Sequence, residues 1–205
     1  MKLEYVKDYL SKKLGLSDSK INKINIYVKL LLNFNKKYNL ISKNSVNDVW
    51  NRHILDSAQI IKLLEFKDDE ILSDFGTGAG LPGIIISIAN NNPRFHVKLY
   101  EKSPVKRSFL KEVQKIANFE IEKNIFDYKK IRTDYIVCRA FKKLNNILQI
   151  SREKVNNPHK VIILKGKNAI NELKKLPKGL DYRYKIVDSV TEKESKIIIA
   201  EKNEK

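Results

Sequence analysis

The sequence predicts an α/β fold with a mostly parallel seven-stranded sheet, preceded by a helical segment. Two observations carry this prediction. From Glu70 onward, short apolar runs typical of strands alternate with stretches typical of helices, as in consecutive βαβ units. Late in the chain, the runs 182–190 and 196–200 are too close together for an intervening helix. We therefore expect these two runs to close the sheet as an antiparallel hairpin.

We expect residues 1–66 to form a helical extension that packs on a domain of residues 67–205. Ile21, Ile24 and Val28 recur at the three- and four-residue spacing of an amphipathic helix, with Ser17 as its candidate cap. A second apolar run occupies 54–64. Before the hairpin, strands are expected at 71–75, 96–100, 120–122, 134–138 and 161–165.

The charge of the chain favours a polyanionic partner. In 205 residues, 41 Lys and Arg oppose 24 Asp and Glu, which gives a formal net charge of +17. Nucleic acid is favoured over a membrane because no long apolar segment exists, although a lysine-rich composition also arises without selection for charge. The single cysteine, Cys138, excludes an internal disulfide, and the first residues lack the apolar core of a signal peptide. We expect a cytoplasmic monomer.

The most informative segment is the glycine-rich stretch 73–83, which predicts a strand, a tight loop and a helix. Three interpretations compete: a turn without a ligand, a dinucleotide loop and an S-adenosylmethionine loop. Four of the seven glycines of the chain lie here, which disfavours the empty turn. Residues 78–83 match the G-x-G-x-x-G pattern, but Pro82 removes one of the N–H donors that pyrophosphate needs.

Two acidic residues favour S-adenosylmethionine. Asp74 precedes a G-x-G-x-G loop that begins at Gly76 and includes Gly78, and a carboxylate suits a ligand that carries an amino group and a sulfonium. Glu101 follows the next strand, where an acid binds ribose hydroxyls. We therefore expect the Rossmann-like class I fold of S-adenosylmethionine-dependent methyltransferases.

The chain also resembles a known family over nearly its whole length. The signature runs from Asp74 to Ile84, and 39–41, 52–57, 106–113, 138–141 and 164–166 agree with it in order and spacing. These motifs are similar to those of the RsmG family, also called glucose-inhibited division protein B. The resemblance implies methylation of N7 of guanine 527 in 16S rRNA, on free rRNA or the small ribosomal subunit.

The resemblance also implies site residues. Gly76 and Leu81 correspond to the methionine and ribose end of the cofactor site, and Ile125 and Phe126 to the pair beside the adenine. Arg139 corresponds to the family's arginine after the fourth strand. The family commonly has an acid at Phe126, so an adenine contact there has to use backbone or ring stacking.

No catalytic acid or base is identified, and no metal site. Guanine N7 is a nucleophile without a proton to remove, so proximity and orientation are sufficient. The alternative from another class is a non-catalytic ribosome-assembly or RNA-binding module with a vestigial loop, which would not bind the cofactor. Cys138 is expected to be a buried core residue.

Several basic residues are candidates for contact with RNA or the base. Arg139 suits the O6 acceptor of guanine or the cofactor carboxylate, with a structural ion pair as the alternative. Arg52 and His53 lie within a turn of Asp56, so a local salt bridge also explains them. A stripe of Arg107, Lys111 and Lys115 fits a phosphate-binding face or a solvated one. Lys165 ends a strand beside Gly166, and its side chain is expected either to contact RNA or to be solvated.

Overall fold

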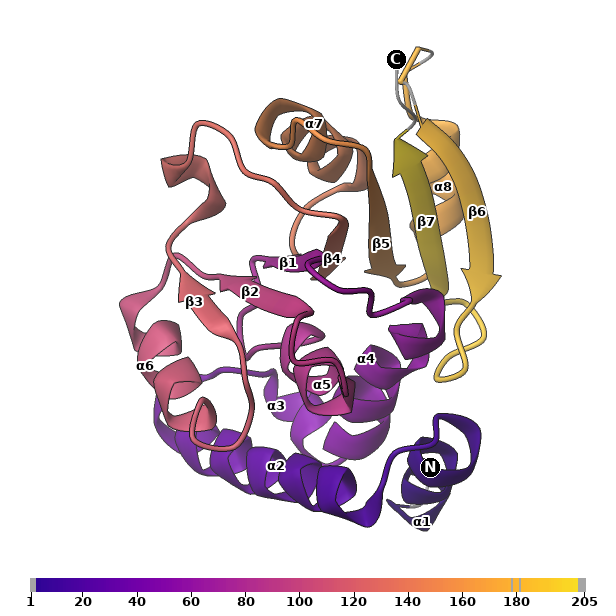
Figure 1. Cartoon of the computed structure of the whole chain (residues 1–205). Helices are drawn as coiled ribbons and strands as arrows, with labels where there is room; N and C mark the ends of the chain where they lie inside the picture. The colour runs from indigo at the N-terminus through magenta and orange to yellow at the C-terminus, as the bar shows by residue number, and fades with distance from the viewer. Residues whose placement is uncertain (1–2, 178, 181, 203–205) are drawn as a thin grey trace.

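In the computed structural model, one sheet of seven strands forms the centre of the protein (Figure 1). The structure describes residues 3–177, 179–180 and 182–202. The sheet order is β3-β2-β1-β4-β5-β7-β6. The pairs from β3 to β5 are parallel, and β7 is antiparallel to both β5 and β6. The strands are β1 (Ile71–Phe75), β2 (His96–Tyr100), β3 (Glu120–Glu122), β4 (Tyr135–Arg139), β5 (His159–Lys165), β6 (Tyr182–Asp188) and β7 (Lys196–Lys202).

The central strands β1, β4 and β5 are buried on both faces because helices cover the sheet from both sides. Side chains alternate between faces along each strand. In β4, Val137 packs into one hydrophobic cluster, while Ile136 and Cys138 pack into the other. The first cluster includes side chains of α2, α5 and α6, and the second those of α7 and α8. Cys138 is fully buried, as expected.

Two helices begin where the capping residues predict. Ser17 accepts a hydrogen bond from the Lys20 N–H at the start of α2, and Ser103 caps α6, which begins at Pro104. The helical elements are α1 (Leu3–Asp8), η1 (Tyr9–Lys13), α2 (Asp18–Tyr38), α3 (Lys43–Val46), η2 (Trp50–Leu55), α4 (Asp56–Ala58), η3 (Gln59–Leu63), α5 (Gly83–Ala89), α6 (Pro104–Val113), η4 (Ile125–Asp127), α7 (Leu144–Lys154) and α8 (Ala169–Lys174).

The bounds of β5, β6 and β7 each differ from the expected ranges by two residues at one end, and three further details also differ. The run 54–64 belongs to a π-helical, an α-helical and a 3₁₀ segment in succession, because it is buried from several sides rather than along one stripe. Strand β4 extends to Arg139, which pairs with Leu164 of β5, and so lies one residue later than expected. Helix α6 ends at Val113, so Lys115 lies beyond it and does not continue the stripe of Arg107 and Lys111.

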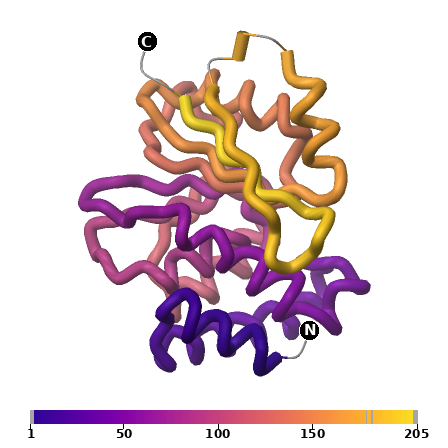
Figure 2. Tube along the Cα trace, turned by 90° about the vertical axis from the view of Figure 1, so that its right-hand side faces the viewer, coloured from indigo at the N-terminus to yellow at the C-terminus, as the bar shows by residue number. Residues whose placement is uncertain are grey.

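The β6–β7 hairpin loop meets the helical segment 50–63 beside the sheet. Figure 2 shows the loop of the β6–β7 hairpin reaching down to the segment that contains η2 and η3. Hydrogen bonds from Gln59 to Ser189 and from Val190 to Gln59 join them. No helix within the described residues has the length and apolar character needed to cross a bilayer.

Candidate functional site

The glycine-rich loop is fixed by Asp74, which lies near the carboxyl end of β1. Its Oδ2 accepts hydrogen bonds from Thr77 Oγ1 at 2.6 Å and from the Gly83 N–H at 2.8 Å. Asp74 is fully buried, and its Oδ1 has no partner among the described residues. Burial outweighs these hydrogen bonds and raises the pKa of Asp74 to about 7. Asp74 therefore fixes the conformation of the loop through these two hydrogen bonds, and its side chain is not exposed at the loop surface.

The loop requires glycine at several positions for different reasons. Gly76, Gly78 and Gly80 have φ angles of 67°, 62° and 91°, in the left-handed region that side chains disfavour. At Gly83 the reason is space, since a Cβ there would lie 2.2 Å from Leu99 Cδ2. At Gly78, by contrast, the nearest atoms to an added Cβ are 3.9 Å or more away. The backbone at Gly78 is therefore open to a ligand.

Glu101 follows β2 and faces the same loop. Its Oε2 accepts from the Gly78 N–H at 2.9 Å, and its Oε1 from the Ser103 N–H at 2.8 Å. Each carboxylate oxygen has a further lone pair, so a fixed carboxylate beside open backbone can accept from a ribose diol. The residues present thus fit a nucleoside such as that of S-adenosylmethionine.

Helix α2 also supports the loop. Tyr27 is fully buried and donates its hydroxyl to the Ala79 carbonyl at 2.8 Å. Burial raises the pKa of the Tyr27 phenol further above neutral pH, so it remains a donor. Sequence analysis did not find this contact, because Tyr27 reads only as one more apolar position on an amphipathic helix.

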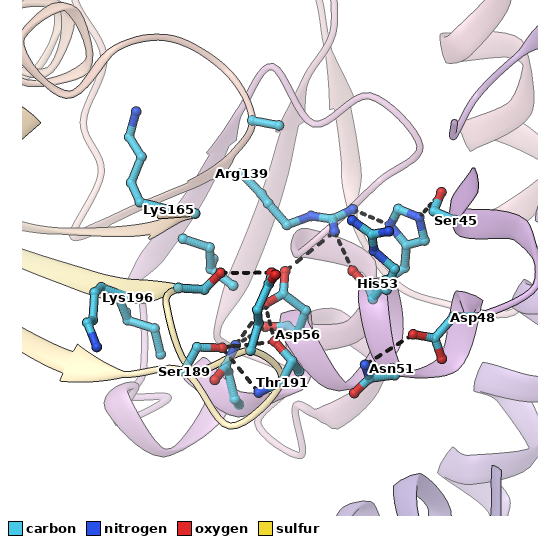
Figure 3. Close-up of a pocket in the computed structure, with 18 of the residues that line it drawn as sticks. Ser45, Asp48, Asn51, His53, Asp56, Arg139, Lys165, Ser189, Thr191 and Lys196 are labelled. Carbon is cyan, nitrogen blue, oxygen red and sulfur yellow. Dashed lines mark hydrogen bonds and ion pairs between the residues drawn. The ribbon is translucent and has the colours of Figure 1, made fainter. Parts of the chain in front are cut away.

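A cavity of about 580 Å³ lies at the carboxyl ends of β4 and β5 (Figure 3). Arg139 and Lys165 line it from the sheet, Arg52 and His53 from η2, and the β6–β7 loop closes another side. The structure therefore brings together four of the predicted residues from three separate parts of the chain. The carboxyl ends of parallel strands are the usual ligand side of such sheets.

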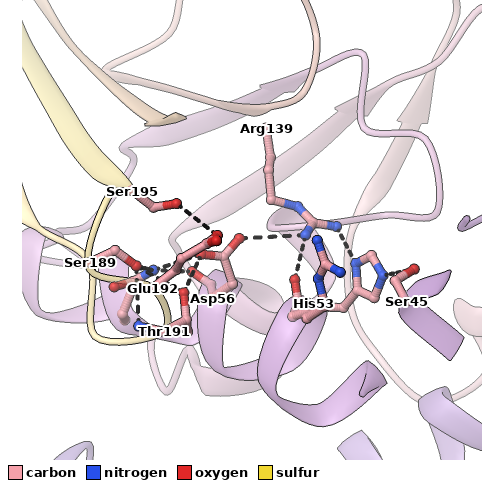
Figure 4. A network of polar contacts seen from close by, with 10 residues as sticks. Ser45, His53, Asp56, Arg139, Ser189, Thr191, Glu192 and Ser195 are labelled. Atoms are coloured by element: carbon pink, nitrogen blue, oxygen red, sulfur yellow. Dashed lines mark hydrogen bonds and ion pairs between the residues drawn. The ribbon is translucent and has the colours of Figure 1, made fainter. Parts of the chain in front are cut away.

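Arg139 connects the sheet to η2 (Figure 4). It donates to the Arg52 carbonyl at 2.9 Å and to His53 Nδ1 at 2.8 Å. Since Arg139 only donates, Nδ1 accepts, and His53 Nε2–H donates to Ser45 Oγ at 2.8 Å. Burial, followed by the charges of Arg139 and Arg52, lowers the pKa of His53 to about 3. His53 is therefore neutral, and both of its ring nitrogens are occupied.

Asp56 joins Arg139 to the hairpin loop. Its Oδ2 lies 3.5 Å from Arg139 Nη1, and its Oδ1 accepts from Thr191 Oγ1 at 3.2 Å and from Gln59 Nε2 at 2.9 Å. Gln59 in turn accepts from the Val190 N–H at 2.9 Å. Burial raises the pKa of Asp56, while Arg139 opposes that shift. The cavity walls are thus held together by one continuous polar network.

The other predicted residues lie in different surroundings. Lys165 donates to Glu172 Oε2 and to the Lys142 carbonyl, each at 2.8 Å, so its ammonium group anchors the loop after β4. Arg107 donates to the carbonyls of Glu101 and Lys102. The exposed Lys111, on α6, is not part of the cavity wall.

Three apolar predicted residues also have distinct surroundings. Leu81 is buried in the main hydrophobic cluster. Ile125 is 1% exposed, whereas the neighbouring Phe126 is 47% exposed. Only Phe126 of this pair presents a side chain to a ligand.

Sequence analysis missed the residues that complete the cavity from a distance. Gln59 contacts Ser189 across 130 residues of sequence, and Thr191 contacts Asp56 across 135. A polar hairpin loop carries no local pattern that predicts its partner, so only a joint view of both segments would reveal it.

Comparison with known proteins agrees with this geometry. Residues 20–201 match the family described as rRNA small subunit methyltransferase G. The ribosomal RNA small subunit methyltransferase G of Rickettsia rickettsii (strain Sheila Smith) is 36% identical over 180 residues, covering 87% of this chain and 92% of that protein. The protein of the same name from Rickettsia akari (strain Hartford) is 37% identical, with coverage of 87% and 92%.

Solved structures agree at the level of the fold. Aeropyrum pernix fibrillarin in complex with natively bound S-adenosyl-L-methionine aligns with a TM-score of 0.57 at 15% identity, covering 73% of this chain and 75% of fibrillarin. MtNAS in complex with MTA and tNA aligns with a TM-score of 0.58 at 13% identity, covering 100% of this chain and 83% of MtNAS. The class I methyltransferase fold is confirmed. With the match over residues 20–201, the chain belongs to the rRNA small subunit methyltransferase G family.

Proposed function

We propose that this protein methylates N7 of guanine 527 in the 16S rRNA of the small ribosomal subunit, with S-adenosylmethionine as methyl donor. The observation that carries this proposal is the pairing of a nucleoside-compatible glycine loop with the cavity beside β4 and β5. Family membership supports rRNA as the substrate class. In this proposal the helices of residues 1–66 form an extension that packs on the core and supplies one wall of the cavity.

The chemistry needs no proton acceptor from the protein. S-adenosylmethionine, when bound, supplies an electrophilic methyl group. Guanine N7 donates its lone pair to the methyl carbon, the carbon–sulfur bond breaks, and the positive charge passes from sulfur to the base. His53 fits this scheme because it is neutral with both nitrogens occupied, so it is not a free base. Cys138 is fully buried and burial raises its thiol pKa, which opposes thiolate catalysis.

The chain contributes position rather than proton transfer. Asp74 and Glu101 hold the loop on which the cofactor rests, and Phe126 stacks beside the adenine while the buried Ile125 supports that segment. Arg139 holds η2 against the sheet and so fixes the distance between the cofactor loop and the cavity. A direct contact of Arg139 with cofactor or guanine stays a prediction, and so do RNA contacts of Arg52, Arg107, Lys111 and Lys165.

The test supplies labelled S-adenosylmethionine to the purified protein with small subunits that lack the modification. Borohydride reduction followed by aniline cleavage maps N7-methylguanine in the rRNA. We expect one protein-dependent cleavage, at guanine 527. Cleavage at another guanine would refute the position, and label without cleavage would refute N7 as the acceptor. Absence of both cofactor binding and methylation would instead favour a non-catalytic RNA-binding role.

A further inference from the structure

Two aromatic rings beside the glycine loop share one cation. The Lys142 ammonium group lies 5.5 Å from the centroid of the Phe126 ring and 5.7 Å from that of Phe141. Both distances fall within the range in which the face of an aromatic ring attracts a positive charge. The space bordered by the two rings therefore already binds a cation in this structure.

Phe141 belongs to the cofactor crevice itself. A Cβ added to Gly76 would lie 2.2 Å from Phe141 Cδ2, so the ring is packed directly on the Gly76 backbone. Gly76 is the position assigned by resemblance to the methionine and ribose end of the cofactor. The Phe141 ring therefore lies next to the part of the site where the cofactor's sulfur is expected.

Hydrogen bonds from β5 and α8 fix the segment that carries Phe141 and Lys142. Lys165 donates to the Lys142 carbonyl, and Glu172, its ion-pair partner, accepts from the Leu144 N–H at 2.6 Å. Ala140, just before Phe141, has a φ of 51°, a backbone conformation that costs energy and persists only where the surrounding contacts enforce it. The ring position is thus built into the loop after β4.

The two acids at the loop do not offer the cation an equivalent site. Asp74 is fully buried and raised in pKa, and its Oδ2 holds Thr77 and Gly83. Glu101 is 5% exposed, and each of its oxygens holds a backbone N–H. At Gly76, the accessible group with an attraction for positive charge is therefore the Phe141 ring.

We propose that the face of Phe141 binds the sulfonium of S-adenosylmethionine, which displaces the Lys142 ammonium group. This inference rests on the proposed function. The product S-adenosylhomocysteine carries a neutral sulfur and gains nothing from the ring face. Phe141 therefore favours the cofactor over the product, and the return of Lys142 to the ring assists product release.

The test measures dissociation constants for S-adenosylmethionine and S-adenosylhomocysteine by titration calorimetry. Phe141→Leu keeps an apolar side chain but removes the ring face. We expect it to shift the ratio of the two constants by roughly 2- to 30-fold against S-adenosylmethionine. Phe141→Tyr should retain the parent ratio. Phe126→Leu is the matched control, because stacking on adenine contributes equally to both ligands.

Several outcomes would overturn the inference. An equal loss of affinity for both ligands in Phe141→Leu would reduce the ring to a packing role. A ratio that shifts in Phe126→Leu instead would place the sulfonium on the other ring. If Phe141→Leu does not fold, Lys142→Met provides the test. Removing the competing cation should lower the dissociation constant of S-adenosylmethionine more than that of S-adenosylhomocysteine, and an unchanged ratio of the two constants would refute the inference. Failure of the parent protein to bind either ligand would refute the proposed function itself, which separates the two results.

Discussion

The difference in unfolding free energy between Asp74→Asn and the parent should shift in favour of the variant as the pH rises. The pKa of Asp74 is about 7 in the folded state, against an ordinary value of 3.8. The folded state therefore binds more protons than the unfolded state between these values, so the parent loses stability as the pH rises through this window. The full shift of about 3 units corresponds to about 4 kcal/mol, of which roughly 2.5 kcal/mol falls between pH 5 and pH 8.

Asparagine has nearly the shape of aspartate but no ionisation. Its side-chain oxygen can accept the hydrogen bonds of Thr77 and Gly83 that Asp74 Oδ2 now accepts. The buried His53 has the opposite effect on the parent, because its lowered pKa makes stability rise with pH below about 6.5. The informative quantity is therefore the difference in unfolding free energy between Asp74→Asn and the parent, in which the histidine contribution cancels.

The assay is urea unfolding of both proteins at half-unit steps from pH 5 to pH 8. We expect the difference to grow by roughly 2.5 kcal/mol in favour of Asp74→Asn. A difference that stays constant over this range would refute the raised pKa of Asp74. In parallel, Asp74→Ala should abolish cofactor binding because the loop loses its acceptor, whereas Asp74→Asn should retain it. Equal loss in both variants would show that the carboxylate charge, rather than the loop shape, binds the cofactor.

Three further substitutions test other parts of the site. Tyr27→Phe leaves the buried Ala79 carbonyl without its donor, so the free energy of unfolding in urea should fall by about 1–3 kcal/mol and cofactor affinity should fall as well. Parent-like values of both quantities would show that α2 does not support the glycine-rich loop. Gln59→Leu removes the hydrogen bonds that hold the β6–β7 loop, so the KM for rRNA should rise while the Kd for S-adenosylmethionine stays unchanged. A matching change in both constants would contradict the role of this loop as a wall of the cavity that receives the RNA base. Lys111→Ala should weaken RNA binding by an amount that fades with added salt, and a salt-independent effect would argue against a phosphate contact.

Much of the fold could be predicted because the central strands are buried on both faces. The expected bounds of β1, β2 and β3 are those of the structure, and at β1 polar residues delimit the apolar run. The segment 50–63 could not be predicted to the same degree. It is covered by α1, α5 and the hairpin loop, so its buried residues no longer follow one helical stripe. Periodicity predicts an element only where one face is exposed to solvent.

For the site, local motifs predicted positions but not partners. Cofactor contacts of Asp74 and Glu101 stay predictions, and the motifs did not reveal that both carboxylates also accept from backbone N–H groups of the loop. Arg139 was expected at the edge of the crevice, and the structure places it there with Asp56 and His53 as partners. The neutral state of His53 follows from burial beside two guanidinium groups, which no local spacing reveals.

Under the proposed function, the charges of the cavity suit a site for the base, with the RNA backbone bound by other surfaces. Its wall carries the cations Arg52, Arg139, Lys165 and Lys196 and the anions Asp48, Asp56 and Glu192. Arg139, Lys165 and Lys196 each have a carboxylate partner, so the cavity is nearly balanced in a protein of net charge +17. Balance suits a neutral guanine that becomes cationic when methylated, since nearby carboxylates favour the developing charge. Added salt should therefore raise the KM for rRNA steeply and leave the single-turnover rate of the bound complex nearly unchanged. Equal salt sensitivity of both quantities would show that methyl transfer itself depends on exposed, screenable charge.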